Sequence, residues 1–311
     1  MSVSVDDLVV SVADAVDAEN MVEVIHAAFG ARPALDPPST AIEETPETIR
    51  AAFAQGGTGI YATVCGRPAG VILVSEAAPG VARWSRVSVH PDFQRHGVAS
   101  TMVAAGEDYA AELGFRRAEL YAREELADLI AFWHHRGFGL ARTVPHGVIL
   151  TKTLPVAIEV PTAEDMQRLG ARLAKVLRRG DLIVASGELG AGKTTLAQGL
   201  GQALDSAGPI ISPTFVLSRV HRSHTGKPDL VHVDAYRLST AAELDDLDLD
   251  AHTADAITLV EWGSGLAEGL ADDRLEIDIR PAANGDHDGR LVLIRGVGRR
   301  WHHVDLEGLH A

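Results

Sequence analysis

The sequence predicts an α/β protein with two domains, and three observations support this prediction. The chain has 311 residues, which is room for two domains of ordinary size. Hydrophobic residues make up 46% and charged residues 23%, the balance of a globular protein with an apolar core. Short apolar runs alternate with helical patterns in two stretches, and prolines mark a join near residue 150. We therefore expect one domain over residues 1–153 and another over residues 156–311.

The charge and the single cysteine narrow the classes of function. The net charge is −15, with 12 basic and 19 acidic residues up to Pro155 and 16 basic and 24 acidic residues after it. Neither half has the excess of Lys and Arg that binds a nucleic-acid backbone, so we expect no DNA partner and only indirect contact with RNA. Cys65 is the only cysteine, which excludes an intramolecular disulfide and a cysteine cage for zinc.

The sequence gives no sign of membrane insertion or secretion. No window approaches eighteen uninterrupted apolar residues, so we expect no membrane span. The first residues carry the acids Asp6 and Asp7 where a signal peptide needs a basic segment. We therefore expect a cytoplasmic protein.

The second half begins with a helix and a buried strand. Thr162 and Asp165 resemble a capping box, and Gly180 ends the helical pattern. The apolar face of this helix is Met166, Leu169, Leu173, Val176 and Leu177. Residues 182–186 are β-branched and apolar, which is typical of a buried strand. Residues 274–280 and 290–296 flank Asn284-Gly285-Asp286 like the two arms of a hairpin.

A phosphate-binding loop follows the strand at 182–186 directly and opens a helix. Residues 187–194 (GELGAGKT) fit the pattern G-x-x-x-x-G-K-[ST]. Glycines let backbone N–H groups surround a phosphate, and the helix N-terminus adds positive potential. Lys193 would contact the β- and γ-phosphates of ATP, and the Thr194 hydroxyl would bind Mg²⁺. The predicted nucleotide-binding residues are Glu188, Leu189, Gly190, Ala191, Gly192, Lys193, Thr194 and Thr195.

Two acids end apolar strands and complete a predicted magnesium site. Asp234 follows Val233, and Glu261 follows Val260. Strand ends on one edge of a parallel sheet converge, so both carboxylates should lie near the phosphate loop. One would hold Mg²⁺, directly or through water, and the other would orient the attacking water; the sequence leaves open which does which. Together with Thr194 they are the candidate metal ligands, and Lys193, Asp234 and Glu261 are the candidate catalytic residues.

The motifs of the second half resemble those of the bacterial TsaE (YjeE) family. The matching segments are, in order, GELGAGKTTLAQGLG, SPTF at 212–215, HVDAYRL, ELDDLDLD and VEWG, and they cover roughly residues 158–300. The resemblance implies a P-loop ATPase that acts with TsaB and TsaD in making threonylcarbamoyladenosine beside the anticodon of tRNA. It also implies a place for Trp262 beside the nucleotide or a partner, and a switch-like loop at residues 212–215.

These assignments have alternatives. Trp262 could be a core residue, and the acid-rich run 243–250 could be either a solvated helix face or a partner-binding site. A small-molecule kinase shares the phosphate loop, although no arginine-rich lid is obvious between that loop and the later strands.

Residues 81–124 of the first half predict a strand, a glycine-containing turn, a helix over Val98–Leu113 and another strand. Gln94, Gly97 and Ala99 fit the pattern [QR]-x-x-G-x-[GA], which resembles the acyl-CoA pyrophosphate loop of the GNAT N-acetyltransferase family. The resemblance covers about residues 5–150 and implies a mixed-sheet αβ fold that binds acetyl-CoA or another acyl-CoA. The implied binding residues are Gln94, Arg95, His96, Gly97, Val98 and Ala99. The proline-containing segment 31–48 is expected to be a loop over this domain.

The acyltransferase activity of the first half is left open by the sequence. Trp133 stands where many GNAT relatives carry a tyrosine that protonates the departing thiolate, and an indole N–H does not give up its proton near neutral pH. Tyr121 or His134 could replace it, and Glu119 or His90 could deprotonate an amine. Alternatively, this half is a non-catalytic module that binds acyl-CoA or a protein.

Overall fold

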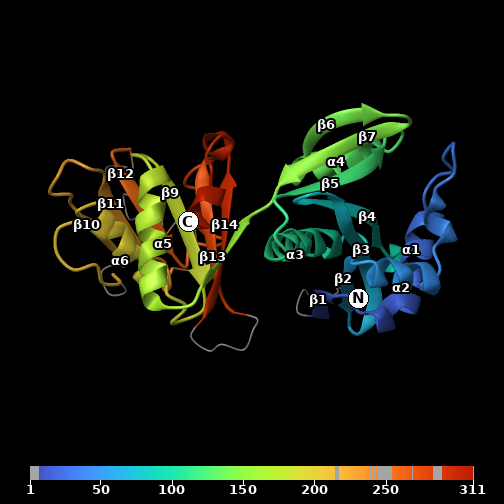
Figure 1. The fold of residues 1–311 in the computed structure, drawn as a ribbon, viewed down its shortest axis with the longest axis horizontal. Coiled ribbons are helices and arrows are strands. Elements are labelled where there is room, and N and C mark those ends of the chain that lie inside the picture. Colours follow the sequence, from blue (N-terminus) through green and yellow to red (C-terminus); the bar gives the residue numbers. More distant parts are fainter. Residues whose placement is uncertain are drawn as a thin grey trace. The chain divides into compact units, whose positions relative to one another are not determined.

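The computed structural model describes residues 7–213, 217–238, 240, 243, 254–267, 269–282 and 289–310. The chain divides into two compact units, Met1–Leu154 and Pro155–Ala311, and each has its own sheet (Figure 1). No helix among the described residues combines the length and the apolar character needed to cross a membrane.

The first unit is a seven-stranded sheet in the order β1-β2-β3-β4-β5-β7-β6, with helices packed against it. Neighbouring strands are antiparallel except β4 and β5, which are parallel. The strands are β1 (Leu8–Val12), β2 (Thr58–Val64), β3 (Arg67–Ala78), β4 (Val81–Val89), β5 (Arg117–Arg123), β6 (Gly139–Val144) and β7 (Gly147–Thr153). The α-helices are α1 (Ala18–Gly30), α2 (Pro46–Ala54), α3 (Val98–Glu112) and α4 (Ala127–His135), with short 3₁₀ turns at Ala15–Asp17, Thr40–Glu43 and Pro91–Phe93.

The sheet of the first unit is split between β4 and β5. Their pairing joins Val81–Trp84 to Arg117–Leu120 and goes no further. Arg86 has a positive φ of 51°, an unusual conformation for a residue that is not glycine, and it lies just beyond the last pair. The later parts of both strands therefore leave a gap inside the unit.

The prediction of a loop over residues 31–48 is wrong for its second part. Residues Thr40–Glu43 form a 3₁₀ helix, and α2 begins at Pro46. Thr45 caps α2 through a hydrogen bond from the Thr48 N–H, and Pro46 occupies the first helical turn, where its missing N–H costs nothing. Proline here starts a helix and does not mark a loop.

The second unit has a seven-stranded sheet in the order β10-β11-β12-β9-β13-β14-β8. The strands β11, β12, β9 and β13 are parallel, and the others are antiparallel to their neighbours. The bounds are β8 (Val156–Val160), α5 (Ala163–Val176), β9 (Leu182–Gly187), α6 (Lys193–Ala203), β10 (Ser218–His221), β11 (Asp229–Asp234), β12 (Ala256–Glu261), β13 (Arg274–Pro281), β14 (Arg290–Val297) and 3₁₀ turns at Arg299–Trp301 and Glu307–His310. The pairing of β13 with β14 confirms the predicted hairpin arms. Its expected turn at Asn284-Gly285-Asp286 lies outside the described residues.

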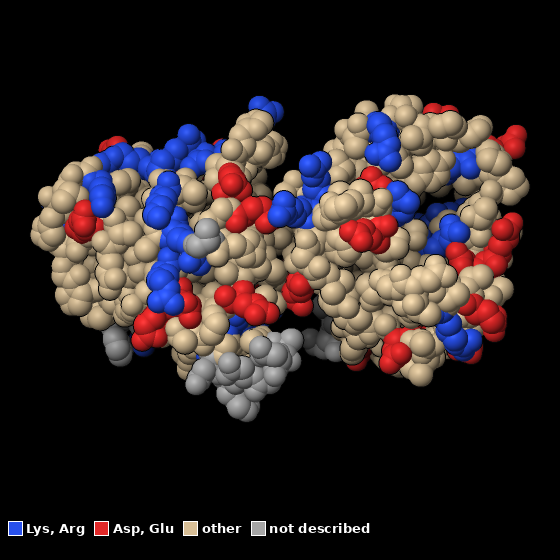
Figure 2. Space-filling model, in the orientation of Figure 1, with Lys and Arg blue, Asp and Glu red and all other residues tan. Residues whose placement is uncertain are grey.

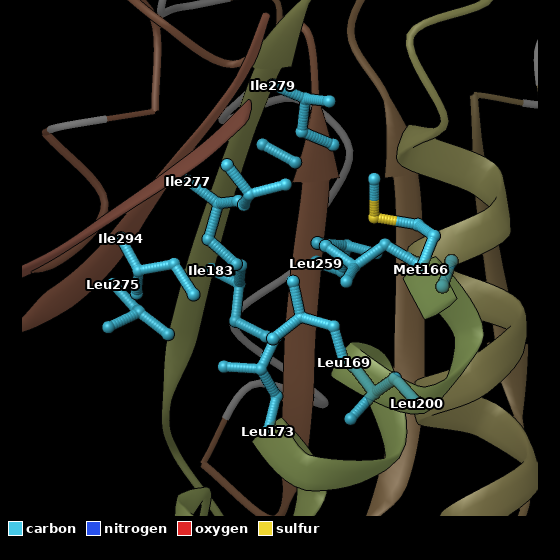
Figure 3. Close-up of a cluster of buried hydrophobic side chains, with 14 of the residues drawn as sticks. Met166, Leu169, Leu173, Ile183, Leu200, Leu259, Leu275, Ile277, Ile279 and Ile294 are labelled. Carbon is cyan, nitrogen blue, oxygen red and sulfur yellow. The ribbon is translucent and has the colours of Figure 1, made fainter. Parts of the chain in front are cut away.

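One hydrophobic core of the second unit fills the space between the sheet and the helices α5 and α6. Figure 3 shows Met166, Leu169 and Leu173 of α5 facing side chains from the sheet strands. The Thr162 hydroxyl caps α5 by accepting the Asp165 N–H, and it donates to the Asp165 carboxylate at 2.8 Å. The predicted apolar face and its start signal thus put α5 where it covers the strands that lead to the phosphate loop.

Basic side chains gather on the outer face of α5 although the second half is acidic overall. Figure 2 shows a row of Lys and Arg over this helix, which carries Arg168, Arg172 and Lys175. The charge balance of a whole half does not reveal such a local basic face.

Two glycines let α5 and α6 touch through their backbones. A Cβ at Gly199 would overlap the backbone of Gln167, and a Cβ at Gly170 would overlap the carbonyl of Leu196. Because both obstacles are backbone atoms, no side-chain movement can relieve the overlap.

We expect Gly199→Ala to lower the free energy of unfolding of the second unit by about 1–3 kcal/mol, since overpacking outweighs the better helix propensity of alanine. The measurement is differential scanning calorimetry of the full chain. Gly30→Ala is the matched control, because a Cβ on this residue of α1 would meet nothing within 4 Å. Equal effects of the two substitutions would contradict the close helix contact.

Candidate functional site

The loop between β9 and α6 has the backbone of an anion-binding turn. Gly187, Gly190 and Gly192 have φ values of +144°, +81° and +110°, which favour glycine. At Gly187 a Cβ would also lie 2.5 Å from the carbonyl oxygen of Ile279. The first N–H groups of α6 have no acceptor within their own helix, so they are available to an anion at the loop.

Lys193 lies inside this loop as the first residue of α6. Its side chain is buried, and Nζ donates hydrogen bonds to the carbonyl oxygens of Gly187 at 2.7 Å and Glu188 at 2.9 Å. Burial lowers the pKa of the Lys193 ammonium, and the carboxylates of Glu261 and Asp234 act in the opposite direction. The loop thus holds a desolvated cation against two neutral carbonyls. A charged phosphate oxygen accepts a stronger hydrogen bond and could replace these carbonyls as the partner of Nζ.

The two strand-end acids lie side by side at the edge of the sheet. Asp234 of β11 and Glu261 of β12 are partners in the parallel register, and both are buried. The Thr194 hydroxyl donates to Glu261 Oε1 at 2.9 Å, so the structure brings this predicted metal-ligand pair together. The Ser212 hydroxyl donates to Asp234 Oδ2 at 2.8 Å. The edge therefore offers two carboxylates and two hydroxyls beside the loop.

Trp262 follows Glu261 in a left-handed backbone conformation, with φ of 61°. Its backbone N–H donates to the Ala185 carbonyl at 2.9 Å, and the centre of its half-buried ring lies 3.7 Å from Lys193 Nζ. Tyr236 packs edge-on against this ring at 5.1 Å and is exposed. The aromatic pair therefore borders the loop, and Tyr236 is a member that the sequence did not single out.

His232 is a second residue that the sequence reasoning missed. It is fully buried in β11, and its Nε2 lies 2.7 Å from Glu261 Oε1. The available signal was a polar residue inside an apolar strand, two positions before Asp234. His232 and Thr194 hold the same oxygen of Glu261 from two sides, which fixes that carboxylate in place.

Some expected residues cannot be placed. Thr214 and Phe215 of the predicted switch-like loop lie outside the described residues. Of the acid-rich run 243–250, only Glu243 is described.

The predicted pyrophosphate loop of the first unit leads into α3. Gly97 has φ of 80° and precedes Val98, the first residue of α3, and Arg95 also has a positive φ, of 64°. Gln94 and Ala99 line a cavity of about 710 Å³. The free N–H groups of the first turn of α3 therefore lie next to open space.

A second cavity of about 550 Å³ lies in the same unit and meets the first one at the split between β4 and β5. Five residues line both cavities, namely Arg32, Val87, Leu126, Leu129 and Trp133. Two chemical groups could thus approach each other through the split, one from each cavity.

The four candidate acid and base residues of this unit differ in their positions. Tyr121 and Glu119 line the 550 Å³ cavity. The Tyr121 hydroxyl donates to the His146 carbonyl at 3.0 Å, and Glu119 accepts from Arg83 at 2.8 Å. His134 Nδ1 lies 2.9 Å from the Phe138 carbonyl, and His90 Nδ1 accepts the Asp92 N–H; neither histidine lines either cavity.

Trp133 is a core residue at the cavity wall. Its ring is 2% exposed and packs against Trp84, Phe132 and Phe138 at 6.4, 5.1 and 5.0 Å. This aromatic packing explains a tryptophan at this position without an acid role.

The family models match each half of the chain. The threonylcarbamoyl adenosine biosynthesis protein TsaE model matches residues 160–290, and the acetyltransferase (GNAT) family model matches residues 23–138. The TsaE of Streptomyces coelicolor is 52% identical over 146 residues, which cover 46% of this chain and 99% of that protein. The TsaE of Bacillus subtilis is 34% identical over 139 residues, which cover 44% of this chain and 84% of that protein. Among solved structures, a PaiA N-acetyltransferase from Thermoplasma acidophilum in complex with coenzyme A is 16% identical and has a TM-score of 0.42. The match covers 47% of this chain and 98% of that one.

Proposed function

Because this chain belongs to the TsaE family, we propose that its second unit is a Mg²⁺-dependent ATPase that converts ATP to ADP and phosphate. The observation that carries the proposal is the meeting of Lys193, Thr194 and Glu261 at one glycine-lined loop. Lys193 supplies the positive charge for the phosphates, and the loop supplies backbone N–H groups.

The residues at the sheet edge suit the metal as well as the nucleotide. Mg²⁺ prefers oxygen ligands, and the Thr194 hydroxyl with the carboxylates of Asp234 and Glu261 offers them. When bound, Mg²⁺ neutralises charge on the phosphates. One carboxylate would hold the metal and the other would orient water, with His232 fixing Glu261. The residues from Glu188 to Thr195 would surround the phosphates, and Trp262 would lie beside the nucleotide.

We further propose that this ATPase acts in the cytoplasm with TsaB and TsaD in the biosynthesis of tRNA threonylcarbamoyladenosine, reaching tRNA through that complex. The family of the second unit supports this role. The test is affinity purification of the full chain from cells of its source, followed by phosphate release with and without purified TsaB and TsaD. We expect both proteins to co-purify and to raise phosphate release. Transfer of phosphate to a small molecule without phosphate release would favour a kinase.

For the first unit we propose an acyl-CoA N-acyltransferase. The supporting observation is the pair of cavities that meet at the split, one of them next to the Gln94–Ala99 loop. The N–H groups of Gly97, Val98 and Ala99 suit a pyrophosphate, and acyl-CoA would supply the activated thioester. The test is coenzyme A release from acetyl-CoA with a panel of amines. Turnover of any specific acceptor excludes the non-catalytic module, and tight acetyl-CoA binding without any turnover supports it.

A further inference from the structure

Arg32 reaches from the end of α1 to the split between β4 and β5. Its backbone N–H donates to the Phe29 carbonyl at 3.2 Å and so completes the helix end. Its guanidinium donates to the Val87 carbonyl at 3.3 Å and lies 3.8 Å from the centre of the Phe29 ring. Burial lowers the pKa of Arg32, but a guanidinium keeps its charge at physiological pH. The side chain therefore brings a partly desolvated positive charge to the split.

The charge of Arg32 is not balanced by a neighbouring acid. The other three arginines that line the 550 Å³ cavity each bind a carboxylate: Arg83 binds Glu119, Arg86 binds Glu44 and Arg123 binds Glu125. Within residues 7–154, Arg32 contacts a carbonyl and a phenyl ring and forms no such ion pair. A partly buried charge without an acidic partner is costly to retain, and an anionic ligand would balance it.

After these ion pairs are counted, Arg32 leaves one positive charge at the cavity wall. Among the described residues that line it, the charged side chains are four arginines and one glutamate, Glu119. The full chain has a net charge of −15, so this excess of arginine runs against the average composition. The cavity wall thus suits an anion better than a cation.

Arg32 also lies where the two cavities join. It lines both the 550 Å³ cavity and the 710 Å³ cavity beside the Gln94–Ala99 loop. If acyl-CoA occupies the side of that loop, the acceptor enters from the 550 Å³ side, and the two react near Val87 and Arg32. A carboxylate close to the reacting amine would then meet the guanidinium.

We propose that the 550 Å³ cavity binds an acceptor amine that also carries a carboxylate, as an amino acid does, and that Arg32 binds this carboxylate. This inference rests on the acyltransferase function proposed above. In the transfer, the amine nitrogen bonds to the thioester carbonyl carbon and the carbon–sulfur bond breaks. The nitrogen gives up a proton as the amide forms, and the departing thiolate of coenzyme A takes up a proton. Arg32 is thus a specificity-determining residue and takes no part in the proton transfers.

The test compares amino acids with their carboxamides as acceptors of the acetyl group from acetyl-CoA, using the full chain and measuring coenzyme A release. We expect the acids to be preferred at least about 10-fold in kcat/KM, since a hydrogen bond to a charged group contributes roughly 10- to 100-fold. Arg32→Gln should abolish the preference mainly through KM, and Arg32→Lys should keep part of it. Arg50→Gln on α2 is the matched control, because Arg50 pairs with Glu19 and lines neither cavity.

Calorimetric binding of acetyl-CoA to each variant separates the two proposals. Wild-type protein that binds acetyl-CoA but accepts amides as well as acids, or accepts neither, overturns this inference and leaves the binding of acyl-CoA intact. Failure to bind acetyl-CoA overturns the proposed function and this inference with it. An Arg32-dependent preference for succinyl-CoA over acetyl-CoA, with acids and amides accepted equally, would put the carboxylate on the acyl group and overturn the assignment to the acceptor. If Arg32→Gln does not fold, Arg32→Lys is the deciding variant: a reduced preference for acids over amides supports the inference, and an unchanged preference overturns it.

Discussion

Replacing Lys193 with alanine is expected to lower ATP turnover by roughly 10²- to 10³-fold, the usual cost of losing one charged or hydrogen-bonding group that acts on developing charge. ATP affinity should fall by about 10- to 100-fold, since the lost contact is charge-assisted. The reason lies in the geometry of the loop, where the Lys193 ammonium is buried and bound to carbonyls that a phosphate can replace. The measurements are phosphate release and calorimetric titration with ATP.

Lys227→Ala is the matched control for this substitution. Lys227 lies in the same unit, pairs with Asp205 and donates to the Ala203 carbonyl at the far end of α6. We expect its removal to leave turnover unchanged. Unchanged ATP affinity in Lys193→Ala would remove Lys193 from the proposed site.

Glu261→Gln is expected to lower turnover by about 10²- to 10⁴-fold, the range for losing a group that orients or deprotonates a reactant. The amide keeps the size of the side chain but loses the negative charge that water or Mg²⁺ would meet. Because Glu261 also binds His232 and Thr194, the amide preserves most of the local packing. The measurement is phosphate release as a function of Mg²⁺ concentration, and we expect half-maximal activity at a higher concentration.

The control for this experiment is Glu276→Gln on β13. Glu276 is partly exposed, pairs with Arg274 and lies opposite Val184 within β9, before the loop begins. Both variants should unfold near the wild-type temperature. Turnover of Glu261→Gln with the wild-type dependence on Mg²⁺ would exclude Glu261 from the metal site and from water activation.

Local sequence signals were enough to predict the strand, loop and helices that carry the proposed ATPase site. The apolar run at 182–186, the glycines at 187–192 and the apolar face of α5 each depend on residues close together in the chain. The strand-end acids could also be expected, because parallel strands of one sheet bring their carboxyl ends together.

Other features depend on distances between remote residues, which no local pattern gives. The bond from His232 to Glu261 spans 29 positions, and the packing of Tyr236 on Trp262 requires both strands to be in register. Likewise, Arg32 looks like any loop arginine until the structure shows that its neighbours at the cavity are paired and it is not. The four prolines between residues 33 and 46 led to the wrong prediction of a loop up to residue 48, because proline is also favoured in the first turn of a helix, as at Pro46.

The backbone contact between α5 and α6 has a consequence for motion. Because the backbones touch at Gly170 and Gly199 and Gln167 donates a hydrogen bond to Gln198 across the contact, the two helices should move as one rigid body. The helix that begins at the phosphate loop should therefore not slide against α5 when nucleotide enters or leaves. A change at the phosphates would therefore shift α5 together with α6, and Tyr236 and Trp262, which follow β11 and β12, are placed to sense the nucleotide beside the same loop.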